Sequence, residues 1–96
     1  MLHWIDTHAH LQDEAFASDY DAVIARAQAV GVNKIVLPAC NEKDQHRVLE
    51  LAAEYPATCY AALGLHPGEV GEDFEQQLAE IQLTLEKQGA VAVGEI

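Results

Sequence analysis

The chain has 96 residues, of which 50% are hydrophobic and 22% charged, enough for one domain with a core of modest size. Its 16 acidic and 5 basic residues give a net charge of −11. Such a surface repels nucleic acid, because DNA affinity depends on Lys and Arg neutralising phosphates. Composition therefore argues against a simple DNA-binding module. A nuclease is compatible with it only if bound cations supply positive charge.

No apolar run approaches the roughly 18 residues that a membrane span needs. The first residues, Met1 to Asp6, lack the basic start and long apolar stretch of a signal peptide. Cys40 and Cys59 have neither a metal-site nor a redox spacing, and we expect both thiols to stay reduced. These features predict a cytoplasmic protein without membrane contact.

The first predicted strand is the short apolar segment 2–5. A helix is expected next, with Ser18 as its N-cap and an acidic first turn. Apolar residues recur three and four positions apart as far as Val30, so they share one helix face. Gly31 then stands where a left-handed C-cap residue would fall.

The second predicted strand, 34–37, is brief and β-branched. Asn41 can cap the helix that follows, and Pro56 must stop it. The remaining predicted elements are a strand over 58–63, a helix that ends at Gly89, and a strand over 90–93. We find no internal linker, so residues 1–96 form one domain.

The predicted order is β-α-β-α-β-α-β, and the strands are apolar on both faces, as buried parallel strands are. This order fits either a doubly wound sheet or a (β/α)₈ barrel, and the pattern alone does not decide between them. A full barrel needs about 250 residues. If the fold is a barrel, the chain holds its N-terminal portion, three βα units and one further strand.

The segment with the clearest chemistry is Ile5-Asp6-Thr7-His8-Ala9-His10, at the end of the first predicted strand. Side chains alternate along an extended chain, so His8 and His10 point the same way and can chelate one ion. Imidazole nitrogens suit zinc and other transition metals. Asp6 has the same parity and could accept a ring N–H, which would fix a histidine tautomer.

Two later strand ends also carry polar groups. Glu95 follows the fourth strand and could bind or bridge metal ions, with Gly94 leaving room for close approach. His66 lies in the turn Gly64-Leu65-His66-Pro67-Gly68 and could contact a phosphate oxygen or move a proton. Because α/β folds place their sites at the carboxyl ends of strands, these groups should converge with the first pair.

Two other histidines do not follow the end of a predicted strand. His3 precedes the core of the first strand, and His46 lies within a predicted helix. Both are expected to be ordinary surface residues.

Three segments together resemble the TatD-related deoxyribonucleases: D-T-H-A-H-L at 6–11, G-L-H-P at 64–67 and G-E-I at 94–96. This family consists of metal-dependent hydrolases on a (β/α)₈ barrel, within the wider amidohydrolase-like group. The resemblance implies an exonuclease that acts on DNA, or on another phosphoester, with two divalent metal ions (Mg, Mn or Zn). It implies that His8 and His10 bind the first ion, that Glu95 bridges to the second, and that His66 contacts a substrate phosphate at the rim.

The family's other ligands, two histidines and an aspartate on later strands, have no counterpart up to Ile96. We therefore expect an incomplete active site and weak or absent hydrolysis by this chain alone. An open barrel also exposes a strand edge and the inner face of its sheet, through which the chain could self-associate.

Three alternatives remain open at this level. The chain could belong to another amidohydrolase-like enzyme, acting on an amide, lactone or phosphoester and distinguished by its later ligands. It could be a non-catalytic remnant that acts in assembly, in which case purified protein would contain no metal. It could be a plain α/β domain with incidental histidines, in which case His8→Ala would leave metal binding unchanged.

Overall fold

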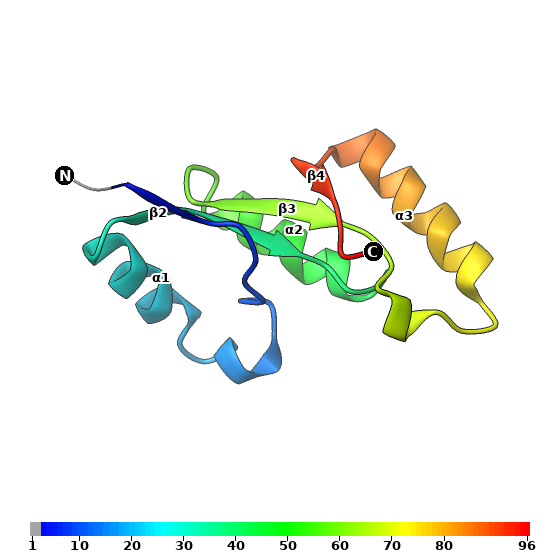
Figure 1. Ribbon diagram of the computed structural model, residues 1–96, viewed down its shortest axis with the longest axis horizontal. Coiled ribbons are helices and arrows are strands. Elements are labelled where there is room, and N and C mark those ends of the chain that lie inside the picture. Colours follow the sequence, from blue (N-terminus) through cyan, green and yellow to red (C-terminus); the bar gives the residue numbers. More distant parts are fainter. Residues whose placement is uncertain (1–2) are drawn as a thin grey trace.

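The computed structural model describes residues 3–96, so Leu2 of the first predicted strand lies outside the described residues. Strands and helices alternate as predicted (Figure 1). The elements are β1 (Trp4–Asp6), α1 (Tyr20–Ala29), β2 (Val32–Pro38), α2 (Asp44–Glu54), β3 (Cys59–Leu63), α3 (Phe74–Gln88) and β4 (Ala92–Val93), with 3-10 turns at Glu14–Phe16 and Pro67–Glu69.

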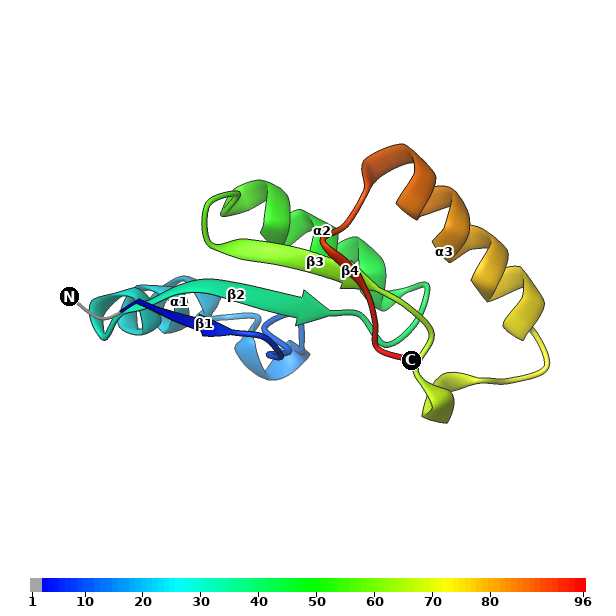
Figure 2. The ribbon, with the colours of Figure 1, turned by 45° about the horizontal axis from the view of Figure 1, so that its top comes forward.

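The four strands form one parallel sheet in the order β1-β2-β3-β4, which is also their order along the chain. In a doubly wound sheet the order reverses at one point, and the helices cover both faces. A sequential order with right-handed crossovers places every helix on one face, as in a barrel. Figure 2 shows this open, curled arrangement. The fold is therefore the N-terminal portion of a (β/α)₈ barrel, and the barrel is incomplete in this chain.

The core lies between the two central strands and the helices that cover them, with α1 packed on β2 and α2 on β3. Alternate residues of each strand point toward the helices. Fully buried side chains come from all four elements: Leu37, Leu63, Ile24, Val48 and Leu51. Each buried side chain of this size contributes about 1.5–3 kcal/mol, which fixes both central strands and hence the positions of their carboxyl ends.

The prediction that all strands are buried on both faces is wrong for the two outer ones. Trp4 and Ile5 of β1 are 56% and 59% exposed, and Val93 of β4 is 63% exposed. These strands have only one neighbour each in the described sheet, so no further strand or helix covers them. The expected exposure of an open barrel edge is confirmed.

Helix ends follow the predicted signals, except for the N-caps of α1 and α2. Ser18 is not the N-cap of α1; that position is taken by Asp19, whose side chain makes no capping bond. Consecutive turns run through the preceding segment, where Asp19 N–H donates to the Phe16 carbonyl, so the helix begins later than predicted. The N-cap position of α2 is Lys43 and not Asn41, although Asn41 Oδ1 does accept from Asp44 N–H at 2.8 Å, and the prediction for Gly31 is confirmed by its φ of +93°.

Helix α3 ends where predicted, with Gly89 as its C-cap, but only part of its apolar surface is buried. Ile81 is buried, whereas Phe74 and Leu78 are 41% and 47% exposed. A side-chain hydrogen bond from Gln45 to Thr84 ties it to α2. Within residues 3–96, no helix is both long and apolar enough to cross a bilayer.

Candidate metal centre

Residues that follow three different strands meet at one end of the sheet. His8 and His10 follow β1, His66 follows β3 and Glu95 follows β4. All four lie beyond the carboxyl ends of their strands, the end where (β/α)₈ barrels carry their sites. The prediction that they converge is confirmed by their distances.

Three ligand atoms form a compact triangle. Nε2 of His8 lies 3.1 Å from Nε2 of His10, and Oε2 of Glu95 lies 3.3 Å and 3.1 Å from these two nitrogens. The rings of His8 and His10 stand edge to face at 86°. Across residues 3–96, this is the group of three or more His, Cys, Asp or Glu side chains that could hold a metal ion.

The triangle has the dimensions that a cation requires. Ligand atoms at about 2.1 Å from one ion lie about 3.0 Å apart in octahedral geometry and about 3.4 Å apart in tetrahedral geometry. The three observed distances fall between these values. Two imidazole nitrogens and one carboxylate oxygen suit zinc, manganese and related ions. The residues present therefore fit the divalent metal that the sequence predicts.

The expected role of Asp6 is wrong. Its Oδ1 accepts the backbone N–H of His8 at 3.0 Å and does not hold an imidazole N–H. This bond shapes the turn after β1 and leaves both rings free to face Glu95. Asp6 therefore supports the backbone of the site rather than a ring tautomer.

Gln12 and Asp44 support His10 and were not recognised in the sequence. Nε2 of the buried Gln12 side chain lies 3.1 Å from His10 Nδ1, 2.9 Å from the Pro38 carbonyl oxygen and 3.0 Å from Asp44 Oδ2, and its two hydrogens can serve two of these three acceptors. Asp44 Oδ2 also accepts the backbone N–H of Cys40 at 2.9 Å. With Nδ1 against Gln12, the His10 ring presents Nε2 to the cluster. Nothing in the sequence signals the contact of Gln12 with Asp44, because these residues are 32 positions apart.

His66 is held in one tautomer by its own turn. The backbone N–H of Gly68 donates to Nδ1 of His66 at 2.9 Å, so the neutral ring carries its proton on Nε2. That nitrogen lies 3.4 Å from Glu95 Oε1, on the other side of the carboxylate from His8 and His10. A protonated Nε2 has no free lone pair for a metal ion. His66 is therefore a hydrogen-bond donor beside the cluster and not a fourth ligand.

Cys40 also borders the cluster, with Sγ 3.9 Å from Glu95 Oε2. Burial, followed by the nearby carboxylates of Asp44, Glu95 and Glu69, raises the pKa of this thiol to about 11. The two cysteines are free, as expected.

A hollow of 270 Å³ opens beside His10, and its lining includes the carboxylates of Asp13, Asp44 and Glu69. Its negative charge favours cations over phosphates. This agrees with the acidic net charge of the whole chain.

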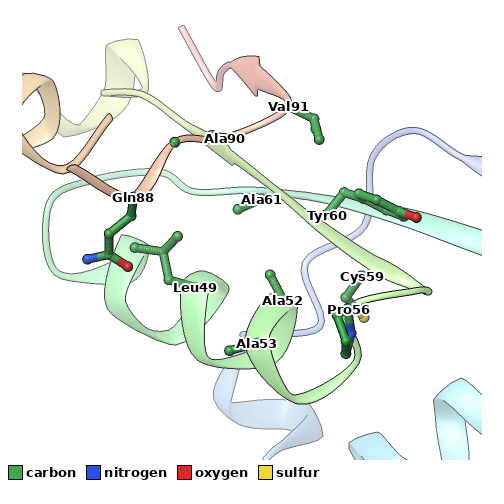
Figure 3. Close-up of a pocket in the computed structure, with 11 residues that line it drawn as sticks. Leu49, Ala52, Ala53, Pro56, Cys59, Tyr60, Ala61, Gln88, Ala90 and Val91 are labelled. Carbon is green, nitrogen blue, oxygen red and sulfur yellow. The ribbon is translucent and has the colours of Figure 1, made fainter. Parts of the chain in front are cut away.

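Figure 3 shows a larger apolar groove of 430 Å³ between α2, β3 and the segment after α3. Alanines and other apolar side chains line it, and Cys59 is the titratable group most deeply placed there. The groove lies at the opposite end of β3 from His66 and carries no set of acid–base groups. It is a packing feature and not the site. His3 and His46 are exposed, and both are ordinary surface residues as expected.

Comparison with known sequences agrees with this geometry. The profile of the TatD related DNases matches residues 5–96, which includes the whole histidine and glutamate cluster. The chain belongs to the TatD-related DNase family. The resemblance inferred from the three short motifs is thus confirmed over nearly the full chain.

TatD relatives include both nucleases and hydrolases without a stated substrate. The chain is 44% identical over 95 residues to the uncharacterized metal-dependent hydrolase YjjV of Escherichia coli K12. It is 37% identical to the metal-dependent hydrolase YabD of Bacillus subtilis and 32% identical to the 3′-5′ ssDNA/RNA exonuclease TatD of Edwardsiella piscicida. The alignments cover 95–97% of this chain but only 35–36% of the relatives.

Comparison with a solved structure gives the same coverage. The crystal structure of E. coli YjjV superposes with a TM-score of 0.85 at 42% identity, covering 97% of this chain and 36% of that protein. The open sheet therefore corresponds to the N-terminal third of a TatD barrel, which confirms the predicted fold class.

Proposed function

We propose that the protein binds a divalent metal ion through His8, His10 and Glu95, and that this site serves hydrolysis of phosphodiester bonds at nucleic-acid ends. The convergence of Nε2 of both histidines and Oε2 of Glu95 within 3.3 Å carries the proposal. Membership of a family that contains 3′-5′ ssDNA/RNA exonucleases supports the substrate class. The metal-dependent hydrolases YjjV and YabD support the use of a metal.

Each residue of the site has a separate role in this proposal. His8 and His10 would hold the ion through Nε2 together with Glu95 Oε2, and Glu95 Oε1, which lies 3.4 Å from His66 Nε2, is the oxygen that would face a second ion. His66 donates Nε2–H to a non-bridging phosphate oxygen. Bound divalent cations (Mg, Mn or Zn) acidify water and neutralise phosphate charge. The cations therefore attract nucleic acid, which the net charge of −11 would otherwise repel.

We propose that these 96 residues carry only the first part of the family's ligand set. The chain spans 36% of its relative YjjV, and the family's ligands on later strands have no counterpart in it. We expect the purified chain to bind Zn²⁺ or Mn²⁺, and to bind a short single-stranded DNA only with the ion present. We also expect it to show weak or absent cleavage of that DNA.

Isothermal titration with the metal alone, then fluorescence anisotropy with a 3′-labelled oligonucleotide, tests these expectations. His8→Ala and His10→Ala should abolish both signals, and His46→Ala is the matched control. No metal binding by the wild type would instead favour the non-catalytic assembly module. Robust turnover that persists through further purification would contradict the incomplete site.

A hydrolase of another amidohydrolase-like class, acting on an amide or lactone, shares the same first ligands. Absence of DNA binding by metal-loaded protein, with metal binding intact, would favour that candidate. The cytoplasm is the proposed location, supported by two cysteines that remain free thiols. Cell fractionation with an antibody against the protein checks it.

Self-association is a separate proposal, supported by the exposed edges. Apolar surface is open at both edges of the sheet, at Trp4 and Ile5 of β1, at Val93 of β4 and at Val91 just before it. A second copy would cover these edges. Sedimentation velocity should show dimers at micromolar concentration, and a monomer throughout the micromolar range would contradict it.

A further inference from the structure

Glu95 reaches the histidines because the sheet is curled and because the chain after β4 crosses over the end of β3. Neighbouring strands lie about 4.8 Å apart, so β1 and β4 of a flat four-stranded sheet would be about 14 Å apart. In the structure, Gly94 N–H donates to the Leu63 carbonyl at 2.9 Å, and Glu95 N–H donates to the Ala39 carbonyl at 3.0 Å. One residue is thus bound to β3, and the next to the loop after β2. Figure 1 shows this terminal segment, in red, passing across the end of β3.

Gly64 lies directly under this crossing. A Cβ atom at position 64 would stand 2.7 Å from the Glu95 carbonyl oxygen and 2.8 Å from the Gly94 carbonyl carbon. Both distances are shorter than real Cβ contacts. The atoms concerned are backbone atoms held by the two hydrogen bonds of the crossing, so they cannot turn aside as a flexible side chain could.

Gly94, one residue before Glu95, has free space where a side chain would lie. A Cβ atom at position 94 would meet no heavy atom within 4 Å. Two glycines that flank the same crossing therefore differ sharply in the space available to a methyl group. This difference makes the requirement for glycine at position 64 specific and testable.

We propose that Gly64 is a positioning residue for the metal site: its missing side chain lets the chain pass low over β3, so that the Glu95 carboxylate meets His8 and His10. The inference rests on the proposed metal site. A methyl group at position 64 raises the crossing and moves Oε2 out of the triangle. Because residues that orient metal ligands affect affinity about 10–100-fold, a loss of that size is expected for Gly64→Ala.

The test compares Gly64→Ala and Gly94→Ala with the wild type by isothermal titration with Zn²⁺. Gly64→Ala should weaken binding 10–100-fold, and Gly94→Ala should stay within about twofold. Titration with Co²⁺ adds a spectroscopic signature, because loss of the carboxylate changes the visible absorption of the ion. Wild-type affinity in Gly64→Ala, or equal losses in both variants, would overturn the proposal.

A double-mutant cycle separates positioning from general damage. In a Glu95→Ala background, Gly64→Ala should cause no further loss, because the ligand that it misplaces is already gone. An equal loss in both backgrounds would show that Gly64 acts through overall stability, and would refute the proposal.

Amide hydrogen exchange tests the crossing without any metal. The Glu95 amide should be protected in the wild type, because it donates to Ala39, and exposed in Gly64→Ala. If Gly64→Ala fails to fold, exchange in the wild type still tests the proposal, because an unprotected Glu95 amide would exclude the crossing. If the wild type binds no Zn²⁺ while this amide is protected, the metal site fails and the crossing over Gly64 stands.

Discussion

Nε2 of His8 faces Nε2 of His10 across 3.1 Å, with the Glu95 carboxylate against both. Two imidazole lone pairs at this distance repel unless a proton or a cation lies between them and the carboxylate. A divalent ion satisfies all three groups at once, and it can do so only in the folded chain, where they meet. Metal binding should therefore be linked to folding.

The first prediction is that Zn²⁺ stabilises the wild type and not His8→Ala. At an ion concentration 100 times the Kd, binding to the native state alone adds about 2.7 kcal/mol to the free energy of unfolding. For a domain of this size that corresponds to a rise in Tm of about 10 °C or more. Differential scanning fluorimetry measures it, and the exposed His46→Ala is the control. An equal rise in His8→Ala would exclude His8 as a ligand.

The second prediction separates His66 from the ligands. Its Nδ1 accepts the Gly68 N–H, so Nε2 carries a proton and cannot bind the ion. His66→Ala should leave Zn²⁺ affinity within about twofold but weaken binding of an oligonucleotide to the metal-loaded protein about 10–100-fold, the value of one hydrogen bond to a charged group. His66→Gln, which restores an N–H donor, should recover part of that loss. A collapse of Zn²⁺ affinity in His66→Ala would contradict this assignment.

The third prediction concerns Asp44, which joins the loop after β1 to the loop after β2. Its Oδ2 accepts from Gln12 Nε2 and from the Cys40 backbone N–H. Asp44→Ala leaves these donors without an acceptor, so it should lower the free energy of unfolding by about 1–3 kcal/mol. Asp21→Ala, at an exposed position in the first turn of α1, removes only a favourable helix-end charge and should cost about 0.3–1 kcal/mol. Urea denaturation compares the two, and equal losses would argue against the network.

The fourth prediction follows from the buried Cys59 thiol. Burial, and then the Glu54 carboxylate, raises its pKa from 9.0 to about 11. Between these values the folded state keeps the proton and the unfolded state loses it, so this contribution to stability is complete below pH 9 and disappears as the pH rises toward 11. A shift of this size corresponds to a contribution on the order of 2 kcal/mol.

Other groups titrate in the same range, so the informative quantity is the difference between wild type and Cys59→Ala. The stability advantage of the wild type should shrink by about 2 kcal/mol between pH 9 and pH 11. Urea denaturation at both pH values gives this difference. A constant advantage would show that the thiol does not titrate differently in the folded protein.

Much of the fold could be predicted because its signals are local. The pairing of His8 with His10 follows from the two-residue period of an extended chain, and Gly31 and Gly89 mark helix ends by their left-handed backbone. Burial was less predictable. Phe74 and Leu78 share the spacing of Ile81, yet only Ile81 is buried, because burial depends on what lies opposite each face.

The sequence by itself determined the order of the elements, the strand-end placement of His8, His10, His66 and Glu95, and the chemistry that these groups can perform. Only the tertiary structure decided that the strands follow one another in the sheet as a barrel. It also decided that Gln12 and Asp44 support His10, and that Glu95 crosses over Gly64 to meet the histidines. The reason is physical: periodicity acts between near neighbours in the chain, whereas a ligand triangle forms only where folding brings distant backbone segments into contact.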